Sequence, residues 1–286
     1  MLLQNSPAIL RHIQRNNIII CSIITNINGL VYIVHNRYNR KGNETLGCTY
    51  GRKALIMNVL IIIPAYNEAG IIEWVVDNLI INYPHFDYIV VNDGSKDDTS
   101  EICRRNGYNL LDLPVNIGLS GAVQAGMKYA EKLEYDAVLQ FDGDGQHDPA
   151  YIQPMVNQMV KTGADIVIGS RFKTVKKSFN PRMLGSRVIH CLVRLTTGYN
   201  MTDPTSGMRL YSMPIAREFA NNINYGPEPD TIAYLLRNGV SLSEVQVGMN
   251  ERKTGESYLN WAGALRYMMR ICSSIVFIQW FRKRSI

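Results

Sequence analysis

The chain has 286 residues, of which 46% are hydrophobic and 19% are charged, a composition ordinary for a globular domain with a sizeable core. Its net charge of +6 is unevenly spread, because residues 58–165 hold 16 acidic and 6 basic side chains, whereas residues 166–286 hold 7 acidic and 17 basic ones. No recognised nucleic-acid motif accompanies the basic half, so we expect an anionic acceptor or an anionic membrane leaflet as its partner, and no nucleic acid. Two solvated faces without any such role are the alternative.

Residues 1–57 differ from the rest of the chain. Their apolar stretch 18–34 is interrupted by polar residues and glycine, and it is shorter than the ~20 residues of a membrane-spanning helix. No small-residue cleavage site follows it, which argues against a secretory signal. Met57 stands directly before the first predicted strand, so we expect a poorly defined basic extension upstream of a natural start at Met57. A basic arm that faces a membrane is the alternative.

From residue 58 onward, short β-rich runs alternate with helix-like segments. The predicted strands span 58–63, 87–92, 108–113, 136–141 and 165–169. The predicted helices span 70–82, 98–106, 119–134 and 149–161. Repeated β-α units of this kind predict an α/β fold with a mostly parallel sheet and helices on both faces. Ligands of such sheets bind at the carboxyl ends of strands, where Glu68, Asp93 and Asp142 fall.

The last segment, 258–286, is predicted to form an amphipathic helix with a basic tail. Arg266, Arg270 and Ser274 share one side at intervals of four residues, and apolar residues occupy another. The apolar run is too short to span a bilayer. The aromatic and basic residues of 279–284 suit a membrane interface. Docking of this helix on the core is an equal alternative.

The run Phe141 to Pro149 is the most informative motif. Asp142 and Asp144 follow an apolar strand with one residue between them, so in an extended segment they point the same way. Two such carboxylates suit a divalent cation whose other ligands are phosphate oxygens, and the glycine between them lets a bulky anion approach the backbone. An acidic turn that caps a helix is the alternative for an isolated Asp-x-Asp.

Six motifs in order resemble those of the family 2 nucleotide-sugar glycosyltransferases, in particular the branch containing dolichol-phosphate mannosyltransferase and the bacterial polyprenyl-phosphate glycosyltransferases. These motifs are Pro64–Glu68, Asn92–Thr99, Asn116–Gly118, Asp142–Pro149, Gly169–Arg171 and Asp203–Arg209. The resemblance runs from about residue 58 to 257 and implies a single GT-A domain over 58–257. It implies inverting, metal-dependent sugar transfer from a UDP- or GDP-linked donor to undecaprenyl or dolichyl phosphate, in cell-surface polysaccharide or glycoconjugate synthesis.

The same resemblance implies Mg²⁺ or Mn²⁺ as cofactor and a peripheral location on the inner face of the cell membrane, with a small membrane protein as a further candidate partner. It matches the metal site to Asp142, Asp144 and Gln146. It matches the donor site to Pro64, Ala65, Tyr66, Glu68, Asp93 and Asp142. It matches the acceptor-phosphate site to Arg171, Arg182 and Ser186. The implied catalytic set is Asp142, Asp144, Arg171 and Arg209, the last beside the donor diphosphate.

Several of these residues have a simpler interpretation. Asp93 suits an Asx turn before a glycine, and Tyr66 suits a packing role. Arg182 suits a solvated helix face, and Arg209 suits an ion pair with Asp203. Residues 251–257 are rich in glycine and charge, as expected of a loop that closes over the donor.

The identity of the acceptor depends on a general base. A sugar hydroxyl loses a proton as it attacks, so it needs a carboxylate nearby, whereas a phosphate monoester is already anionic. Glu228 and Asp230 are the candidates, but no clear Glu-Asp pair occupies the position where hydroxyl-directed relatives carry their base. This favours a phosphate acceptor and leaves a saccharide hydroxyl as the alternative.

Other classes of protein have less support. A sugar nucleotidyltransferase is expected to carry a glycine-rich basic loop where Pro64–Glu68 stands, and a dehydrogenase is disfavoured because G-x-G-x-x-G is missing. The five cysteines are scattered without a Cys-x-x-Cys pair, which argues against a zinc site or disulfide framework and fits a reducing cytoplasm. A non-catalytic scaffold of a membrane polysaccharide complex remains open.

Overall fold

The computed structural model describes residues 11–15, 18–27, 30–38, 57–175, 181–222, 226–249, 261–278 and 281. The chain divides into two compact units, Met1–Ile56 and Met57–Ile286. The first unit contains an antiparallel sheet in the order β1 (Arg11–Arg15), β2 (Ile18–Ile27) and β3 (Leu30–Tyr38). No regular element was predicted there. Asn28-Gly29, which separates β2 from β3 in the sequence, is a dipeptide typical of two-residue hairpin loops.

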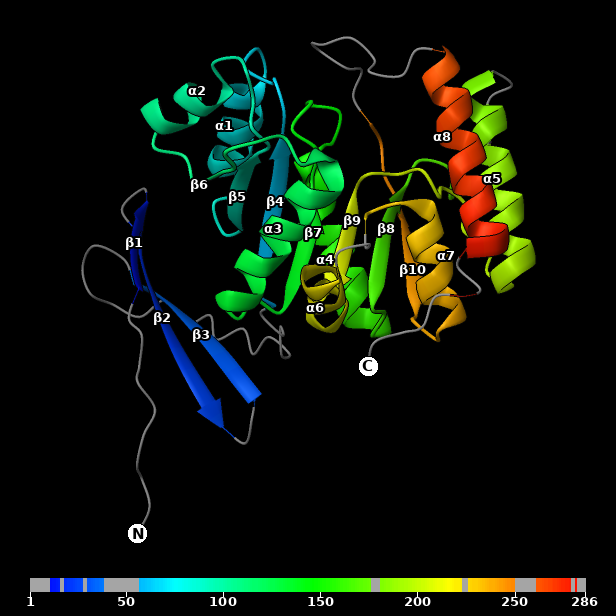
Figure 1. The fold of residues 1–286 in the computed structure, drawn as a ribbon. Coiled ribbons are helices and arrows are strands. Elements are labelled where there is room, and N and C mark those ends of the chain that lie inside the picture. The colour runs from blue at the N-terminus through cyan, green and yellow to red at the C-terminus, as the bar shows by residue number, and fades with distance from the viewer. Residues whose placement is uncertain are drawn as a thin grey trace. The chain divides into compact units, whose positions relative to one another are not determined.

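The second unit is built on one seven-stranded sheet with the order β10-β8-β9-β7-β4-β5-β6 (Figure 1). Its strands are β4 (Val59–Ala65), β5 (Asp87–Asn92), β6 (Leu110–Asp112), β7 (Ala137–Gln140), β8 (Ile166–Ser170), β9 (Arg209–Ser212) and β10 (Leu242–Gln246). Neighbouring strands are parallel except around β9, which runs antiparallel to both β7 and β8. The predicted mostly parallel sheet is therefore confirmed.

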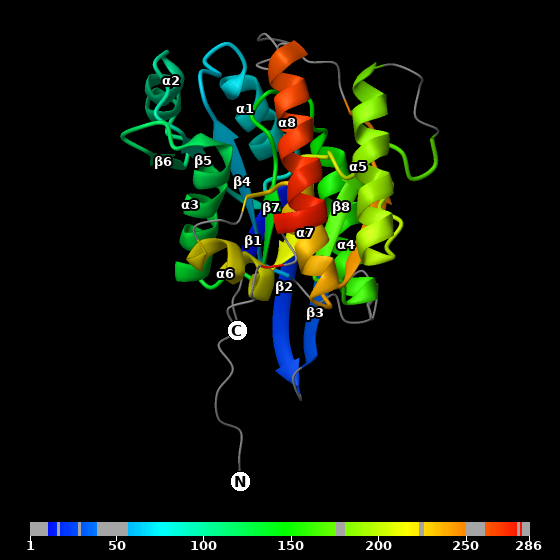
Figure 2. The same ribbon diagram turned by 45° about the vertical axis from the view of Figure 1, so that its right-hand side comes forward.

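Helices cover both faces of this sheet (Figures 1 and 2). One face packs against α1 (Ile72–Asn82), α2 (Thr99–Arg105) and α4 (Ile152–Thr162), which follows the short 3₁₀ turn Pro149–Tyr151. The other face packs against α3 (Gly118–Lys132), α5 (Pro181–Thr197), α6 (Met213–Asn221), α7 (Pro229–Arg237), α8 (Trp261–Ser273) and the π-helical turn Ser274–Ile278. Among the described residues, none of these helices combines the length and the hydropathy that crossing a membrane requires.

The apolar run at the start of β4 explains why this strand is central. Ile61 and Ile63 point into the core on the α1 and α4 side, whereas Leu60 and Ile62 point into the core on the α3 side. Side chains alternate between the faces of a strand, so only an uninterrupted apolar run fills both cores. The carboxyl end of β4 is thereby held in the middle of the sheet edge that carries the site.

The C-terminal helix docks on the core by one side. Ile271 and Ile275 are fully buried in the cluster on the α3 side. Ser274 is buried as well, and its hydroxyl donates to Asp230 at 2.6 Å. Of the predicted polar stripe, Ser274 is therefore buried, whereas Arg270 is exposed and pairs with Glu228. The basic tail 279–284 lies outside the described residues apart from Phe281.

Candidate active site at the carboxyl edge of the sheet

The carboxyl ends of β4, β5 and β7 bring three of the predicted motifs together. The Asp93 N–H donates to the carbonyl of Ala65 at 2.9 Å, and the Phe141 N–H donates to Ile62 at 2.9 Å. Gly143 lies so close to β4 that a Cβ atom there would stand 3.0 Å from the Pro64 carbonyl oxygen. The first strand-end loop, the Asp93 loop and the Asp-x-Asp motif thus form one continuous edge.

Asp93 joins this edge to the loop before α3. Its side chain is buried, and its Oδ1 accepts a hydrogen bond from the Ile117 N–H at 2.7 Å. Gly94 has φ +62°, and a Cβ atom at that position would lie 2.5 Å from the backbone nitrogen of Asn116. The carboxylate of Asp93 therefore positions the loop of the Asn116–Gly118 motif.

The loop after β4 is held against the Asp93 loop by reciprocal contacts. The N–H of Asn67 donates to Ser95 Oγ at 2.9 Å, while Asn67 Oδ1 accepts from the Lys96 N–H at 2.8 Å. The N–H of Glu68 donates to Thr99 Oγ1 at 2.9 Å. Both predicted donor-binding loops are consequently parts of one rigid wall.

The Asp-x-Asp motif alternates between buried and partly exposed residues. Asp142, Asp144 and Gln146 are partly exposed, and the residues between them are buried. Both carboxylates are thus partly accessible, but the segment is not extended as predicted, because Gly143 and Asp144 lie in a turn and Gly145 has φ +76°. Asp144 Oδ1 also accepts a hydrogen bond from the Gln146 N–H at 3.0 Å, which ties the motif into a compact turn.

Asp142 is enclosed by three neighbours. Gln140 Nε2 donates to its Oδ1 at 3.3 Å. The backbone N–H of Asp142 donates to Nδ1 of the buried His147 at 2.9 Å. Gly207 approaches from the loop before β9, and a Cβ atom there would stand 2.3 Å from Asp142 Oδ2. The roles of His147 and Gly207 were not predicted, because neither residue has a spacing that signals a ligand.

The donor atoms of the motif suit a hard divalent cation. Within the described residues, no three His, Cys, Asp or Glu side chains gather into a cluster. Asp142, Asp144 and Gln146 can supply only oxygen ligands, which Mg²⁺ and Mn²⁺ prefer. A site with two carboxylates and one amide leaves further coordination positions for the oxygens of a diphosphate.

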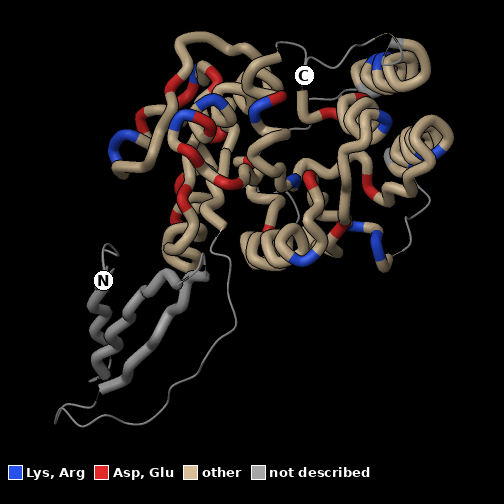
Figure 3. Tube along the Cα trace, turned by 90° about the horizontal axis from the view of Figure 1, so that it is seen from below, with Lys and Arg blue, Asp and Glu red and all other residues tan. Residues whose placement is uncertain are grey.

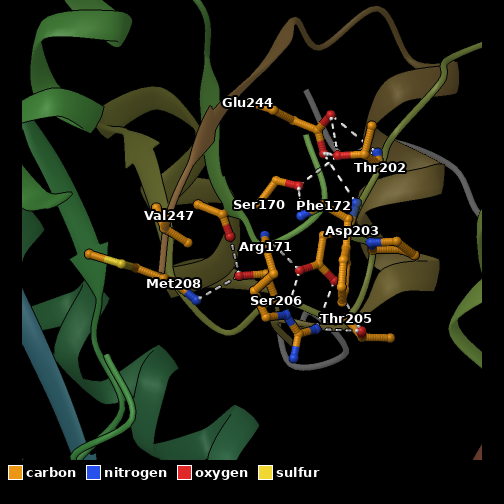
Figure 4. A network of polar contacts seen from close by, with 12 residues as sticks. Ser170, Arg171, Phe172, Thr202, Asp203, Thr205, Ser206, Met208, Glu244 and Val247 are labelled. Atoms are coloured by element: carbon orange, nitrogen blue, oxygen red, sulfur yellow. Dashed lines mark hydrogen bonds and ion pairs between the residues drawn. The ribbon is translucent and has the colours of Figure 1, made fainter. Parts of the chain in front are cut away.

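Arg171, directly after β8, forms a two-point ion pair with Asp203 (Figure 4). Arg171 Nε donates to Asp203 Oδ2 at 2.6 Å, and Arg171 Nη2 donates to Oδ1 at 2.8 Å. The Asp203 side chain is 0% exposed, and that of Arg171 is 27% exposed. The suggested pairing of Arg209 with Asp203 is wrong, since Arg171 is the cation that pairs with Asp203 and Arg209 donates to backbone carbonyls instead.

A second buried carboxylate, Glu244 on β10, holds the backbone of the segment that carries Asp203 (Figure 4). It accepts hydrogen bonds from the Thr202 N–H at 2.9 Å and from the Asp203 N–H at 3.3 Å. The hydroxyls of Thr202 and Ser170 are 2.6 Å apart. Glu244 is missing from the predicted site, because it acts on residues more than 40 positions away in the sequence.

Arg209 is the first residue of β9, and it is only 2% exposed. Its Nε and Nη2 donate to the carbonyls of Ser206 and Pro204 at 2.8 and 2.9 Å. Its Nη1 has no hydrogen-bond partner among the described residues, and neither has Oε1 of Gln140, which stands opposite Arg209 across the strand pair. Two buried polar atoms on the facing residues Gln140 and Arg209 thus lack a partner there, a costly arrangement unless a ligand completes it.

The remaining predicted acceptor residues lie on or near α5. Ser186 is buried, on the inner side of that helix. The side chain of Arg182 and the whole of 251–257 lie outside the described residues.

The predicted donor residue Tyr66 directly follows β4, and its side chain is partly buried.

The two general-base candidates are both engaged by the C-terminal helix. Arg270 Nη2 donates to the two oxygens of Glu228 at 2.8 and 2.7 Å, and Asp230 accepts from Ser274. The hydrogen bond to Glu228 raises the pKa of Arg270. Burial, with the charge of Glu228 as a smaller cause, raises the pKa of the neighbouring Tyr267. These contacts fasten α7 to α8.

The model of glycosyl transferase family 2 matches residues 60–219. Undecaprenyl-phosphate mannosyltransferase of Micrococcus luteus is 32% identical over 216 residues, covering 71% of this chain and 88% of that protein. UDP-N-acetylglucosamine–dolichyl-phosphate N-acetylglucosaminyltransferase of Methanococcus voltae is 29% identical over 212 residues, covering 66% and 84%.

Among solved structures, glucosyl-3-phosphoglycerate synthase from Mycobacterium tuberculosis, in complex with Mn²⁺, UDP and glucosyl-3-phosphoglycerate, superposes with a TM-score of 0.59. The match covers 80% of this chain and 82% of that chain at 18% sequence identity. At this identity the likeness establishes the GT-A fold.

Proposed function

Because the chain belongs to glycosyltransferase family 2, we propose that it transfers a sugar from a nucleotide diphosphate sugar to a polyprenyl phosphate with inversion at the anomeric carbon. The observation that carries the proposal is the convergence of four strand ends on one edge. Asp93 and the Asp142 motif stand there beside the Arg171–Asp203 pair. A donor wall and an anion-binding group thereby adjoin the same pair of carboxylates.

On the donor side, we assign the nucleoside to the wall formed by Pro64, Ala65, Tyr66, Glu68 and Asp93. Asp142, Asp144 and Gln146 would hold Mg²⁺ or Mn²⁺ against the donor diphosphate. The bound ion supplies Lewis-acid stabilisation of the negative charge on the leaving diphosphate. The unpartnered Nη1 of Arg209 supports a further contact with a diphosphate oxygen, because such a contact would satisfy a buried donor.

On the acceptor side, we assign the phosphate to Arg171, Arg182 and Ser186. A phosphate oxygen attacks the anomeric carbon, the new carbon–oxygen bond forms, and the bond to the diphosphate breaks with its electron pair on the leaving group. No proton has to be removed from a phosphate monoester dianion. The engagement of Glu228 and Asp230 by α8 supports this choice, since neither carboxylate is presented as a free base.

An acceptor anchored in lipid requires the enzyme to work at a membrane surface. We propose a peripheral location on the inner leaflet of the cell membrane, where nucleotide sugars are available. The names of the two relatives, which carry undecaprenyl and dolichyl phosphate, support this assignment. A small membrane protein that assists binding remains a prediction.

The proposal is tested with the purified full-length protein, a panel of UDP- and GDP-sugars, polyprenyl phosphate in detergent, and either Mn²⁺ or Mg²⁺. We expect labelled sugar to enter the lipid phase only when metal is present, and chelation with EDTA to stop the reaction. Nucleoside diphosphate release should match product formation in equal amounts.

Two outcomes would contradict the proposal in different ways. Transfer to free saccharides in buffer without lipid would identify a hydroxyl acceptor. Absence of both transfer and donor hydrolysis across the whole panel would favour a scaffold of a membrane polysaccharide complex.

A further inference from the structure

Arg171 offers only one of its nitrogens to a ligand. A guanidinium carries five N–H groups. Nε and Nη2 of Arg171 donate to the two oxygens of Asp203, and Nη2 also donates to Thr205 Oγ1 at 3.1 Å (Figure 4). Within the part of the chain that the structure describes, no residue accepts a hydrogen bond from Nη1. The two N–H groups of Nη1 are therefore the pair that a phosphate can engage, and the orientation of Asp203 decides where they point.

The orientation of Asp203 depends in turn on Glu244. Residues 166–286 hold 7 acidic and 17 basic side chains, and Figure 3 marks those that are described along the chain. Among the described acidic residues of this half, Asp203 and Glu244 are the two that are buried. Glu244 accepts hydrogen bonds from the N–H groups of Thr202 and Asp203. The backbone that carries one buried carboxylate is thus fixed by another, and these donors help to offset the burial of its charge.

The carboxylate of Glu244 also sets the direction of a chain of hydroxyl groups. Thr202 Oγ1 lies 3.1 Å from both oxygens of Glu244, and a carboxylate has no proton to donate, so the threonine is the donor. Because its single proton is used there, the Thr202 hydroxyl accepts from Ser170, whose oxygen is 2.6 Å away. The Ser170 oxygen accepts in turn from the Phe172 N–H at 3.2 Å. Glu244 therefore also fixes the backbone directly after Arg171.

We propose that Glu244 is a positioning residue for the acceptor: through Thr202 and Asp203, it holds Nη1 of Arg171 in the orientation that the acceptor phosphate requires. The inference deepens the proposed function and rests on it, because it takes the ligand of Arg171 to be a phosphate monoester. Glu244 is buried and its oxygens accept from backbone and hydroxyl donors, so it acts through these contacts without touching the substrate. Misplacement of a binding group by about 1 Å can cost about a hundredfold in rate, so loss of this support is measurable.

The first test compares Glu244→Gln with Ser243→Ala. Glutamine keeps the size of the side chain but turns one acceptor oxygen into an N–H donor, which then faces the donors of Thr202 and Asp203. We expect the KM for polyprenyl phosphate to rise about tenfold to a hundredfold, and the KM for the nucleotide sugar to stay unchanged. Ser243→Ala is the matched control on the same strand, because it removes the hydrogen bond from Gln158 at 2.7 Å, and it should change neither KM.

A second pair of variants separates positioning from folding. Thr202→Val removes the hydroxyl that joins Ser170 to Glu244, whereas Thr202→Ser keeps it, so only the valine variant should raise the KM for polyprenyl phosphate. Misfolding would instead lower the amount of active protein, and with it kcat, and leave both KM values as they are.

The Nε–H signal of Arg171 in ¹H–¹⁵N spectra of the full-length protein gives a readout that needs no turnover. The signal is identified by its absence from the spectrum of Arg171→Lys. It should shift in Glu244→Gln and Thr202→Val, because the carboxylate that accepts from Nε–H then moves. It should keep its position in Thr202→Ser and Ser243→Ala.

An unchanged KM for polyprenyl phosphate in Glu244→Gln would overturn the inference, as would equal KM values in Thr202→Val and Thr202→Ser. So would an Arg171 signal that does not respond to Glu244→Gln. If Glu244→Gln does not fold, the two Thr202 variants decide alone. Failure of the proposed function is distinguishable, because the unmodified protein would then transfer sugar to a saccharide hydroxyl and not to polyprenyl phosphate, while the Arg171 signal would still shift in Glu244→Gln and Thr202→Val.

Discussion

Nδ1 of His147 accepts a hydrogen bond from the backbone N–H of Asp142 at 2.9 Å, while its Nε2 lies 3.5 Å from Oδ2 of the same residue. Since Nδ1 is the acceptor, the ring carries its proton on Nε2, facing the carboxylate. The imidazole thus holds both the backbone and the side chain of a residue assigned to the metal. The imidazole is buried and packs edge-on against the ring of Phe141, with 5.4 Å between the two ring centroids.

His147→Phe should therefore weaken metal binding. The phenyl ring fills the space but offers no acceptor and no N–H, and loss of such an orienting contact typically costs 10–100-fold in metal affinity. Mn²⁺ affinity measured by electron paramagnetic resonance with nucleoside diphosphate present reports this directly. His190→Phe is the control, because His190 contacts the Met201 carbonyl. An equal loss of affinity in both variants would argue against a specific role.

Asp144→Asn should reduce sugar transfer by about a hundredfold or more and leave the fold intact. One lost negative charge weakens the hold on the ion that neutralises the diphosphate. Steady-state kinetics at saturating Mn²⁺, with circular dichroism as the check on folding, measures the effect. Asp148→Asn is the matched control in the same loop, because asparagine can still accept from the Ala150 N–H as Asp148 does. Near-normal turnover of Asp144→Asn would contradict the metal assignment.

Arg171→Ala should destabilise the fold as well as affect catalysis. Its removal leaves Asp203 as a buried carboxylate without its cation, which costs about 3–5 kcal/mol. The free energy of unfolding in urea, compared between the variant and the unmodified protein, measures this cost. Arg104→Ala provides the comparison, since Arg104 pairs with Asp112 at the surface and such pairs contribute about 0–1 kcal/mol. Equal stability of the two variants would contradict this role, because it would mean that the buried charge of Asp203 does not depend on Arg171.

Arg182→Ala should raise the KM for polyprenyl phosphate about tenfold to a hundredfold and leave the KM for the nucleotide sugar unchanged. A lost charge-assisted contact with a phosphate is worth roughly 1.5–3 kcal/mol. The comparison variant, Arg194→Ala on the same helix, should change neither value when the acceptor is dispersed in detergent. A selective loss of affinity for the nucleotide sugar would instead assign Arg182 to the donor site.

A protein that starts at Met57 should transfer sugar and unfold thermally like the full chain. Met1–Ile56 and Met57–Ile286 are separate compact units, and all six motifs lie in the second. We accordingly propose the second unit as the catalytic one. Loss of transfer, or of vesicle binding, on truncation would assign a function to the first 56 residues.

The strands that could be predicted are those with a continuous apolar run between turn residues. The strand predicted at 58–63 is β4 (Val59–Ala65), and the strand predicted at 165–169 is β8 (Ile166–Ser170). The short strands β9 and β10 were missed, because Arg-Leu-Tyr-Ser and Leu-Ser-Glu-Val-Gln have neither a long apolar run nor a clear alternation. Strand direction depends on pairing between distant segments, so the reversal at β9 has no local signal.

In the candidate site, too, local features could be predicted from the sequence, whereas contacts between distant residues could not. The motif of Asp142 and Asp144 is local and could be predicted, because it directly follows an apolar strand, but the turn at Gly143 and Asp144 was not predicted. The pairing of Arg171 with Asp203 joins residues 32 positions apart, and the support from Glu244 joins residues 42 apart. Such contacts are set by the sheet order, which composition and spacing do not encode.

The antiparallel course of β9 has a consequence for how this enzyme can change. Its neighbours β7 and β8 end at the site, but β9 begins there, so the turn at 203–208 stands between the Asp142 motif and Arg171. In the proposed assignment the nucleoside wall comes from the chain before β7 and the acceptor residues from the chain after β8, with β9 between them. We therefore expect substitutions on α5 to alter the choice of acceptor and to leave the nucleotide-sugar specificity unchanged, whereas Arg209, at the start of β9, is assigned to the donor diphosphate.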